Sequence, residues 1–304
     1  MYDQISANKR RSVLLIVAFV LLLVAVGWAV DVLFGFGLGA VGVAAVLAIA
    51  LSFGAYWKSD AIALAVSHAR PADLVEHARL HNLVEGLCIA AGLPKPRVYV
   101  IEDDAPNAFA TGRDPRHAAI AVTTGLLRKL NRVELEGVLA HELSHVKNYD
   151  ILVSTLAVTL VGVLTLLADV SLRFLWFGGL RHRDDRSGGG GGGPAALLGI
   201  LGFALLLLAP LAGRMMQFAV SRRRELLADV TGVSLTRYPP GLISALEKLR
   251  DDTTVVHSAS RATAHLWIEA PVARSHAEGR QAWLNRLFDT HPPLEERIAA
   301  LREL

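Results

Sequence analysis

Residues 141–145 read His-Glu-Leu-Ser-His, and a long apolar run begins soon after them at Ile151. Two histidines four positions apart lie on one face of an α-helix, where both imidazoles can bind the same zinc ion. The glutamate between them can take a proton from the attacking water of a hydrolytic reaction. The motif therefore predicts a catalytic Zn²⁺ site on a helix, one ion per chain, with His141 and His145 as ligands and Glu142 as the general base.

The helix that carries the motif is expected to begin after Asn131. Asn131 and, three positions later, Glu134 have the pattern of a capping box, which puts both histidines in the later turns of the helix. Asp150 follows the motif, and its carboxylate could hold the second ring nitrogen of a ligand histidine, as carboxylates behind metal ligands do. Alternatively, Asp150 is a solvated charge at a membrane boundary.

Apolar segments of the kind that cross a bilayer occur before and after the motif. A spanning helix needs about 20 apolar residues, and segments near this length run from Val13 to Val30, from Phe36 to Tyr56, from Ile151 to Val170 and from Ala195 to Gly213. The first two are expected to form a tight, uncleaved hairpin. The last two either cross the membrane or enter it without fully crossing, and the glycine run at 188–193 is a flexible linker between them.

Basic residues favour one orientation of the first hairpin. Lys9, Arg10 and Arg11 precede its first span, the connector around Asp31 has no lysine or arginine, and Lys58 follows its second span. The positive-inside rule then places the N-terminus, and the active site after the hairpin, on the cytoplasmic side of the cell (plasma or inner) membrane in a multi-pass protein.

A third metal ligand has to come from another part of the chain, because catalytic zinc sites combine three protein ligands with one open position. Residues 221–229, which read Ser-Arg-Arg-Arg-Glu-Leu-Leu-Ala-Asp, predict a helix after the fourth apolar segment. Glu225 and Asp229 share one face of that helix. We expect Glu225 to be the third ligand and Asp229 to support the site from behind. In the alternative, both carboxylates only pair with the arginines of residues 222–224.

The region between residue 58 and the motif is expected to be a small mixed α and β unit. Helical spacing of apolar residues predicts an amphipathic helix over residues 72–91, and runs rich in Val, Ile and Ala predict strands at Arg97–Ile101 and Ala118–Val122. The segment Asn107–Gly112 between the strands has two interpretations. It is either a plain loop or an edge strand that binds an extended peptide by strand addition.

Two other features of this region resemble functional sites, but we do not expect either of them to have a function. His77 and His81 are also four positions apart, but no carboxylate base lies between them and Arg79 does, which indicates surface histidines. Cys88 is the one cysteine of the chain, so no intramolecular disulfide can form. Its apolar surroundings are typical of a buried, inert thiol.

Composition places the chain among membrane proteins. Hydrophobic residues make up 53% of its 304 residues, which is too many for an ordinary soluble domain. The net charge of +3 comes with arginines that flank apolar segments, and no basic-aromatic surface pattern accompanies it, so nucleic acid is not expected as a partner. The expected partners are the lipid bilayer and peptide or membrane-protein substrates.

These motifs together resemble the HtpX group of membrane-bound zinc metalloproteases, which is related to the CAAX prenyl proteases. The resemblance covers nearly the whole chain. The matching segments are HELSH at 141–145, SRRRELLAD at 221–229, NAFATG at 107–112, AAIAVTTGLL at 118–127 and DTHPPLEERI at 289–298.

The resemblance implies the zinc ligands and the base already named, and it adds residues that would contact the substrate. Asn107, with Ala108 and Phe109 after it, lies in the segment that would pair with the substrate backbone. His291 would steady the oxyanion. In the alternative, His291 simply belongs to the turn that starts the last helix, because two prolines follow it.

We therefore expect a mainly α fold, a multi-pass helical membrane protein with a small α+β, zincin-like catalytic domain. Residues 1–57 would form an N-terminal transmembrane hairpin, and residues 58–150 the catalytic domain with the motif helix. Residues 151–213 would form a second apolar hairpin with its glycine-rich connector. Residues 214–304 would complete the catalytic domain and supply its third zinc ligand.

The expected function is zinc-dependent endopeptidase activity at a membrane, with membrane-protein quality control as the role that the resemblance implies. A CAAX-type processing protease is one alternative, although its relatives have more membrane spans. A catalytically silent, zinc-stabilised membrane chaperone or scaffold is the other. A structural zinc site has no need of a base such as Glu142 and usually fills the fourth position with a ligand.

Overall fold

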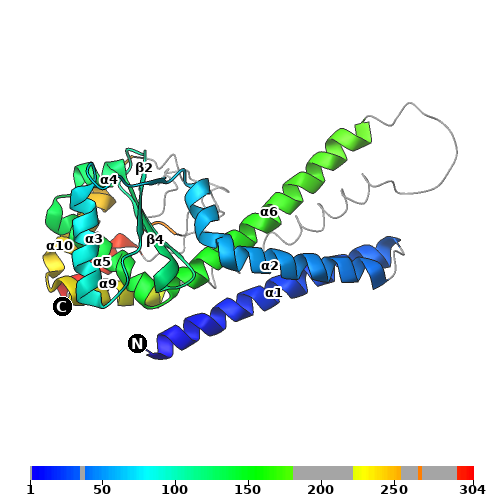
Figure 1. The fold of residues 1–304 in the computed structure, drawn as a ribbon, viewed down its shortest axis with the longest axis horizontal. Helices are drawn as coiled ribbons and strands as arrows, with labels where there is room; N and C mark the ends of the chain where they lie inside the picture. The colour runs from blue at the N-terminus through cyan, green and yellow to red at the C-terminus, as the bar shows by residue number, and fades with distance from the viewer. Residues whose placement is uncertain (1, 35–37, 181–221, 255–265, 269–292) are drawn as a thin grey trace.

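The computed structural model describes residues 2–34, 38–180, 222–254, 266–268 and 293–304. Within these ranges the chain is mainly helical and contains one small mixed sheet (Figure 1). In chain order the elements are α1 (Tyr2–Phe34), α2 (Leu38–Val66), β1 (Arg70–Pro71), α3 (Ala78–Ala91), β2 (Arg97–Ile101), β3 (Ala108–Gly112), the 3-10 helix η1 (Pro115–His117), β4 (Ala118–Thr123), α4 (Thr124–Lys129), α5 (Arg132–Lys147), α6 (Asp150–Leu180), α9 (Arg222–Thr236), α10 (Pro239–Asp251) and α12 (Leu294–Arg302).

The sheet has the strand order β1-β2-β4-β3, with β2 parallel to β4 and both outer pairs antiparallel. The two predicted strands are confirmed as β2 and β4. Residues 108–112 form the edge strand β3, with Ala108 opposite Val122 on β4, so the loop interpretation of this segment is wrong. The reason is non-local: its backbone groups pair with β4, and Thr123 N donates to Asn107 O at 2.9 Å.

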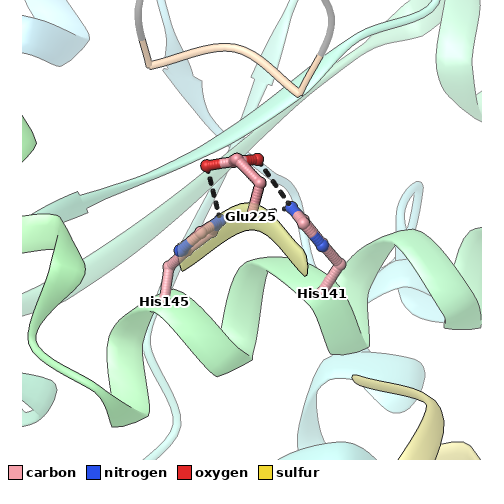
Figure 2. A group of neighbouring side chains, drawn as sticks. All are labelled: His141, His145 and Glu225. Atoms are coloured by element: carbon pink, nitrogen blue, oxygen red, sulfur yellow. Dashed lines mark hydrogen bonds and ion pairs between the residues drawn. The ribbon is translucent and has the colours of Figure 1, made fainter. Parts of the chain in front are cut away.

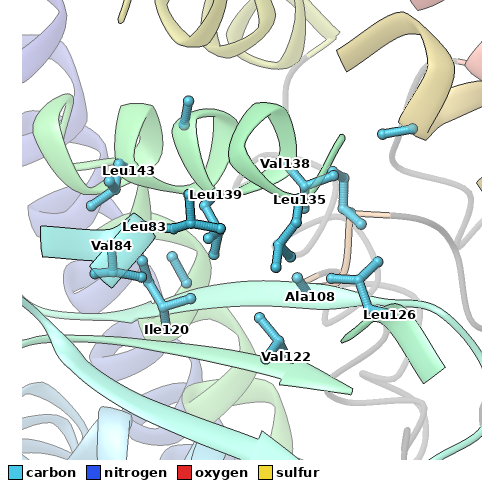
Figure 3. Packing of buried hydrophobic residues seen from close by; sticks show 14 of the residues in the cluster. Leu83, Val84, Ala108, Ile120, Val122, Leu126, Leu135, Val138, Leu139 and Leu143 are labelled. Carbon is cyan, nitrogen blue, oxygen red and sulfur yellow. The ribbon is translucent and has the colours of Figure 1, made fainter. Parts of the chain in front are cut away.

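The two faces of the sheet contribute to different hydrophobic cores. Alternate residues of a strand point to opposite faces, so Ala108 and Ile120 pack with the buried face of α5, as Figure 3 shows, together with residues of α3, α10 and α12. Phe109 and Ala121 belong instead to a core shared with α1, α2 and α6. The sheet thus has the motif helix against one face and the long apolar helices α1, α2 and α6 against the other.

Helices α1, α2 and α6 contact one another and extend away from the sheet (Figure 1). Two helical stretches among the described residues are long and apolar enough to cross a bilayer, Gln4–Trp28 and Val41–Val66. Helices α5 and α6 are bent by 82° relative to each other and would count as a third, broken span. The predicted segment 195–213 and the glycine run lie outside the described residues.

The helix predicted over residues 72–91 is shorter than expected, because α3 begins only at Ala78. Asp73 Oδ1 accepts hydrogen bonds from Val75 N and Glu76 N, at 2.8 and 2.9 Å. This local turn competes with the start of a helix. The helix ends as the sequence suggests, with Gly92 in the left-handed region at φ 68°.

Helices α5 and α9 cross in very close contact at Gly232. A Cβ atom at this position would lie 3.0 Å from His141 N and 3.2 Å from Ala140 C, closer than a side chain normally approaches backbone. Glu225, Asp229 and Gly232 are spaced i, i+4 and i+7, so they share one face of α9. The crossing therefore brings both carboxylates over the histidine motif of α5.

Candidate metal centre

Helix α5 is fixed at its start by the capping box that the sequence predicts. Asn131 Oδ1 accepts from Val133 N and Glu134 N at 2.9 and 3.0 Å, and Glu134 Oε2 accepts from Asn131 N at 2.8 Å. Glu134 also accepts from Ser244 Oγ at 2.7 Å and from Lys248 Nζ at 2.8 Å, which ties α5 to α10. The histidine motif thus lies on a helix that has a well-defined start and is mostly buried.

The structure brings His141, His145 and Glu225 together, as Figure 2 shows. The two Nε2 atoms of the histidines lie 3.2 Å apart. Glu225 spans both rings, with Oε2 at 3.7 Å from His141 Nε2 and Oε1 at 3.6 Å from His145 Nε2. No other group of His, Cys, Asp and Glu side chains among the described residues has metal-binding geometry.

The spacing of these donor atoms fits a tetrahedral metal ion. Zinc–nitrogen bonds of about 2.0–2.1 Å at tetrahedral angles put donor atoms about 3.3–3.4 Å apart. The observed separations of 3.2, 3.6 and 3.7 Å are close to this value. Three donors leave one tetrahedral position open, which is the arrangement of catalytic rather than structural zinc sites.

The charges around the donors also fit a divalent cation. The buried ionisable side chains next to the two histidines are four carboxylates and two guanidinium groups, a formal balance of −2 when all are ionised and the histidines are neutral. Buried charge of this size is costly unless it is neutralised. These side chains are Glu142, Asp150, Glu225, Asp229, Arg224 and Arg297.

Each histidine has a carboxylate behind it. His141 Nδ1 lies 2.8 Å from Asp229 Oδ1, and His145 Nδ1 lies 3.1 Å from Asp150 Oδ2. Such contacts keep the proton on Nδ1 and turn the Nε2 lone pair toward the metal. Asp150 is only 5% exposed, so the interpretation of this residue as a solvated boundary charge is wrong.

The interpretation of Glu225 and Asp229 as mere partners of the neighbouring arginines is wrong as well. Among the described side chains of residues 222–224, Arg224 lies with Nη1 at 3.5 Å from Asp150 Oδ1. Glu225 faces the histidine Nε2 atoms, and Asp229 contacts His141. The carboxylates of α9 therefore point into the histidine cluster.

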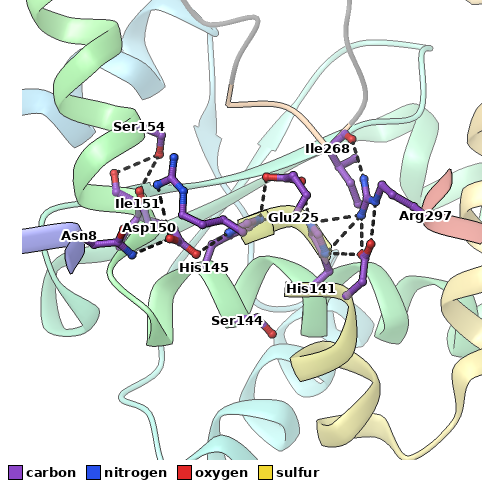
Figure 4. Close-up of polar contacts among 12 residues, drawn as sticks. Asn8, His141, Ser144, His145, Asp150, Ile151, Ser154, Glu225, Ile268 and Arg297 are labelled. Carbon is purple, nitrogen blue, oxygen red and sulfur yellow. Dashed lines mark hydrogen bonds and ion pairs between the residues drawn. The ribbon is translucent and has the colours of Figure 1, made fainter. Parts of the chain in front are cut away.

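Arg297 belongs to the site although the sequence did not single it out. Its side chain is fully buried and donates from Nη2 and Nε to the two oxygens of Asp229, at 2.6 and 2.8 Å (Figure 4). A third donor, Nη1, reaches Ile268 O at 3.3 Å. The available signal was a basic residue on the apolar stripe of the last helix, between Leu294 and Leu301. Arg297 holds the carboxylate that holds His141.

These contacts shift the pKa of His141 strongly. Burial and the Arg297 guanidinium act to lower it, but Asp229 and Glu225 outweigh them and raise the pKa of His141 to about 9. Burial acts to raise the pKa of Asp229, but Arg297 and His141 lower it to about 2. Asp229 is therefore an anion at all ordinary pH values, and the metal-free His141 prefers to carry a proton.

Glu142 differs from the carboxylates that pair with the histidines and arginines of the site. Its side chain is buried, and burial raises the pKa of its carboxyl group, although the neighbouring His141 and His145 act in the opposite direction. No hydrogen bond to its carboxylate is present within the described part of the chain. A carboxylate with a raised pKa and open oxygens is suited to accept and pass on a proton.

The edge strand β3 lies beside the site, and part of its open edge has partners. Ile268 N donates to Ala108 O at 2.9 Å, and the Trp267 ring lies edge-on to Phe109 with centroids 4.9 Å apart. At the far end of the strand, Gly112 N donates to Thr155 Oγ1 of α6 at 3.4 Å. A backbone group of this chain thus already bonds to the edge at Ala108.

The other residues considered from the sequence do not join the cluster. His77 and His81 are half-buried, and His81 Nε2 lies 3.1 Å from Ala72 O rather than near a second ligand. Cys88 is buried, and burial raises the pKa of its thiol to about 11, in line with the expected inert role. His291 lies outside the described residues.

Comparison with known proteins gives a consistent result. The model of the family described as Peptidase family M48 matches residues 75–304. A "Protease HtpX homolog" of Thermoanaerobacter pseudethanolicus is 44% identical over 305 residues, which cover 100% of this chain and 98% of the relative. One of Streptococcus gordonii is 41% identical over 308 residues, 100% of both chains. The crystal structure of S. mikatae Ste24p is similar to 99% of this chain and 67% of that chain, at 18% identity and a TM-score of 0.48.

The raised pKa of His141 predicts a pH-dependent metal affinity. In the metal-free protein His141 is protonated below about pH 9, so a bound metal has to displace this proton. Affinity should therefore rise with pH between pH 7 and 9, by up to about tenfold per pH unit for one displaced proton. Competition between the full chain in detergent and a chelator of known Zn²⁺ affinity measures this slope. An affinity that is flat over this range would contradict the assignment of His141.

Proposed function

The chain belongs to peptidase family M48 and is a membrane metalloendopeptidase, and from this premise we propose that Zn²⁺ is its metal, that Glu142 is its general base and that membrane proteins are its substrates. His141, His145 and Glu225 would hold the ion. One observation carries the proposal: three donor atoms with zinc-like spacing lie beside a buried carboxylate that has no hydrogen-bond partner among the described residues.

Zn²⁺, when bound, would polarise the scissile carbonyl group and acidify a water molecule. Glu142 would accept the proton of the attacking water and pass it to the leaving amine. The raised pKa of Glu142 supports both steps, because the protonated carboxyl must persist long enough to serve as an acid. Asp229 and Asp150 would keep the histidine rings in place during the reaction, without contacting the substrate.

The peptide substrate would bind as a further strand along the open edge of β3. In an antiparallel pair, backbone groups alternate between the partner strand and the opposite side. Because Asn107 O accepts from Thr123 N, the groups of Ala108 and Ala110 are the ones that face the open edge. A substrate would replace Ile268 at Ala108 O, and the side chains of Asn107 and Phe109 would border it.

The role of His291 in steadying the oxyanion is part of the same proposal. It rests on the matching motif, DTHPPLEERI at 289–298. The last helix of that motif supports it, because Arg297 Nη2 lies 3.3 Å from His141 Nδ1. The C-terminal segment thus contributes to the surroundings of the metal site.

We propose a multi-pass protein with its active site facing the cytoplasm. The N-terminal part of α1 contacts the catalytic unit: Asn8 bonds to Asp150, and the Lys9 ammonium lies 4.8 Å from the Tyr149 ring. These contacts support a membrane boundary at the basic residues 9–11, on the same side as the site. The positive-inside rule assigns such a boundary to the cytoplasm, and the role in membrane-protein quality control follows the resemblance alone.

Two other functions are less well supported. A CAAX-type processing protease would share the metal chemistry, but a chamber of many spans is not matched by the two or three possible spans in the described residues. A zinc-stabilised scaffold without activity would have no use for the buried carboxylate of Glu142.

Replacing Glu142 tests the proposed chemistry. Glu142→Gln should lower the rate of cleavage of a membrane-protein substrate by about 10²–10⁴-fold, because the general base is lost, while bound Zn²⁺ stays at one per chain. The matched control is Glu136→Gln, the same chemical change on the same helix, which should leave both values unchanged. Cleavage rates and metal content are measured on all three proteins. Equal cleavage by wild type and Glu142→Gln would rule out this mechanism.

Backbone methylation of the substrate tests the pairing with β3. A series of extended peptide inhibitors, each with one N-methylated amide, should show an alternating pattern of affinity. Methylation at an amide that faces Ala108 or Ala110 should weaken inhibition by about three- to tenfold, the value of one hydrogen bond. Methylation at the neighbouring amides, which serves as the control, should have little effect. Inhibition constants without any alternation would contradict strand addition.

A further inference from the structure

A buried asparagine of the first membrane helix contacts the back of the metal site. Asn8 is 2% exposed, and its Nδ2 lies 2.7 Å from Asp150 Oδ1 and 2.9 Å from Asn148 O (Figure 4). An amide NH₂ group has two hydrogens, so it can donate to both acceptors at once. These bonds connect α1 to the corner between α5 and α6.

The Asp150 carboxylate is shared between two sides. Its Oδ1 accepts from Asn8 and lies 3.5 Å from Arg224 Nη1, while its Oδ2 lies 3.1 Å from His145 Nδ1. The donors at Oδ1 restrict the rotation of the Asp150 carboxylate. The second oxygen is then presented to His145 in one orientation, which directs the opposite ring nitrogen toward His141 and Glu225.

Asn8 also stabilises the corner from which Asp150 projects. Asn148 caps the C-terminal end of α5, where backbone carbonyls lack partners inside the helix, and Asn8 satisfies its carbonyl. The next residue, Tyr149, has φ 60°, an uncommon conformation for a residue other than glycine. The two hydrogen bonds from Asn8 therefore hold the carboxylate and the turn that carries it.

The position of Asn8 is set by the packing of α1. Asn8, Ser12, Leu15 and Phe19 are all buried and follow one another at intervals of three or four residues, so they form one face of the helix. Ser12 Oγ donates only to Asn8 O, within the same helix. The apolar part of this face belongs to the core shared with α2, α6 and the sheet. Asn8 and Ser12 are thus the polar end of a buried face that is apolar at Leu15 and Phe19.

We propose that Asn8 is a positioning residue of the metal site, acting through Asp150 on His145. The first membrane helix would then be a part of the metal centre in addition to anchoring the protein. This inference rests on the proposed role of His145 as a metal ligand. It adds a direct physical link between the seating of α1 and the affinity of the site for its metal.

The test is Zn²⁺ affinity, measured on the full chain in detergent by competition with a chelator. Asn8→Ala should bind Zn²⁺ about tenfold more weakly than wild type, and Asp150→Asn about 10–100-fold more weakly, the usual effect of losing a carboxylate behind a ligand. In the Asp150→Asn background, Asn8→Ala should cause little further loss, because the carboxylate through which Asn8 acts is already gone. Wild-type affinity in Asn8→Ala would overturn the proposal. So would a double variant whose loss of affinity equals the product of the losses in the two single variants.

Matched variants separate this effect from general damage to the helix contact. Ser12→Ala lies one turn away on the same buried face and should bind Zn²⁺ like wild type; an equal loss there would mean that any change in this face has the effect. If Asn8→Ala does not fold, Asn8→Ser leaves a smaller void and supplies a single donor. It should show an intermediate loss, and wild-type affinity in this variant would equally overturn the proposal.

A last variant tests the premise independently. His145→Ala should abolish tight Zn²⁺ binding whatever the role of Asn8. Unchanged binding in His145→Ala would overturn the proposed metal site, and with it the role of Asn8. Loss of binding in His145→Ala together with wild-type affinity in Asn8→Ala would overturn the role of Asn8 alone.

Discussion

The close crossing of α5 and α9 at Gly232 is the contact on which the rest of the structure depends. The histidine motif of α5 supplies two donor atoms on one helix face and cannot supply a third at the right distance. The third comes from Glu225, which the chain reaches only after the apolar segment that begins with α6. Because Gly232 has no side chain, α9 can lie against the backbone at His141. The site is therefore assembled from parts that lie on either side of an apolar segment.

Burying so many charges is costly, and the arrangement shows how the cost is offset. Asp229 is held between His141 and Arg297, and Asp150 between His145, Arg224 and Asn8. Removing one partner of such a buried pair typically costs about 3–5 kcal/mol, because the other charge is left without compensation. Each histidine is thus fixed through a carboxylate that is itself fixed by a donor from a distant helix, α12 on one side and α9 and α1 on the other. Both histidine rings are thus held by contacts among side chains of this chain alone.

The sequence was informative where the signal is local. The capping box of α5, the pair His141 and His145, and strands β2 and β4 all follow from short-range patterns, and the need for a third ligand led to Glu225. Non-local pairing was harder to predict. Strand β3 forms because its backbone pairs with β4. From the sequence alone, both a loop and a strand were open interpretations of this segment.

The same limit applies to the residues behind the site. Arg297 and Asn8 are unremarkable in their own helices, and their roles depend on partners 68 and 142 positions away, Asp229 and Asp150. The one clear error in a helix boundary, at Asp73, came from a carboxylate that bonds its own backbone. Polar residues on apolar helix faces are the pattern that would have identified both missed residues.

The central claim is that α5 and α9 hold one metal ion together, and the Zn²⁺ affinity of Glu225→Ala tests it most directly. The proper comparison is Glu247→Ala, the same substitution at a glutamate of α10 whose partner is Arg302, away from the site. The account predicts that wild type and Glu247→Ala bind one Zn²⁺ with equal affinity, and that Glu225→Ala binds it at least about 100-fold more weakly, as expected when one of three protein ligands is removed. Equal affinity in Glu225→Ala and wild type would contradict it.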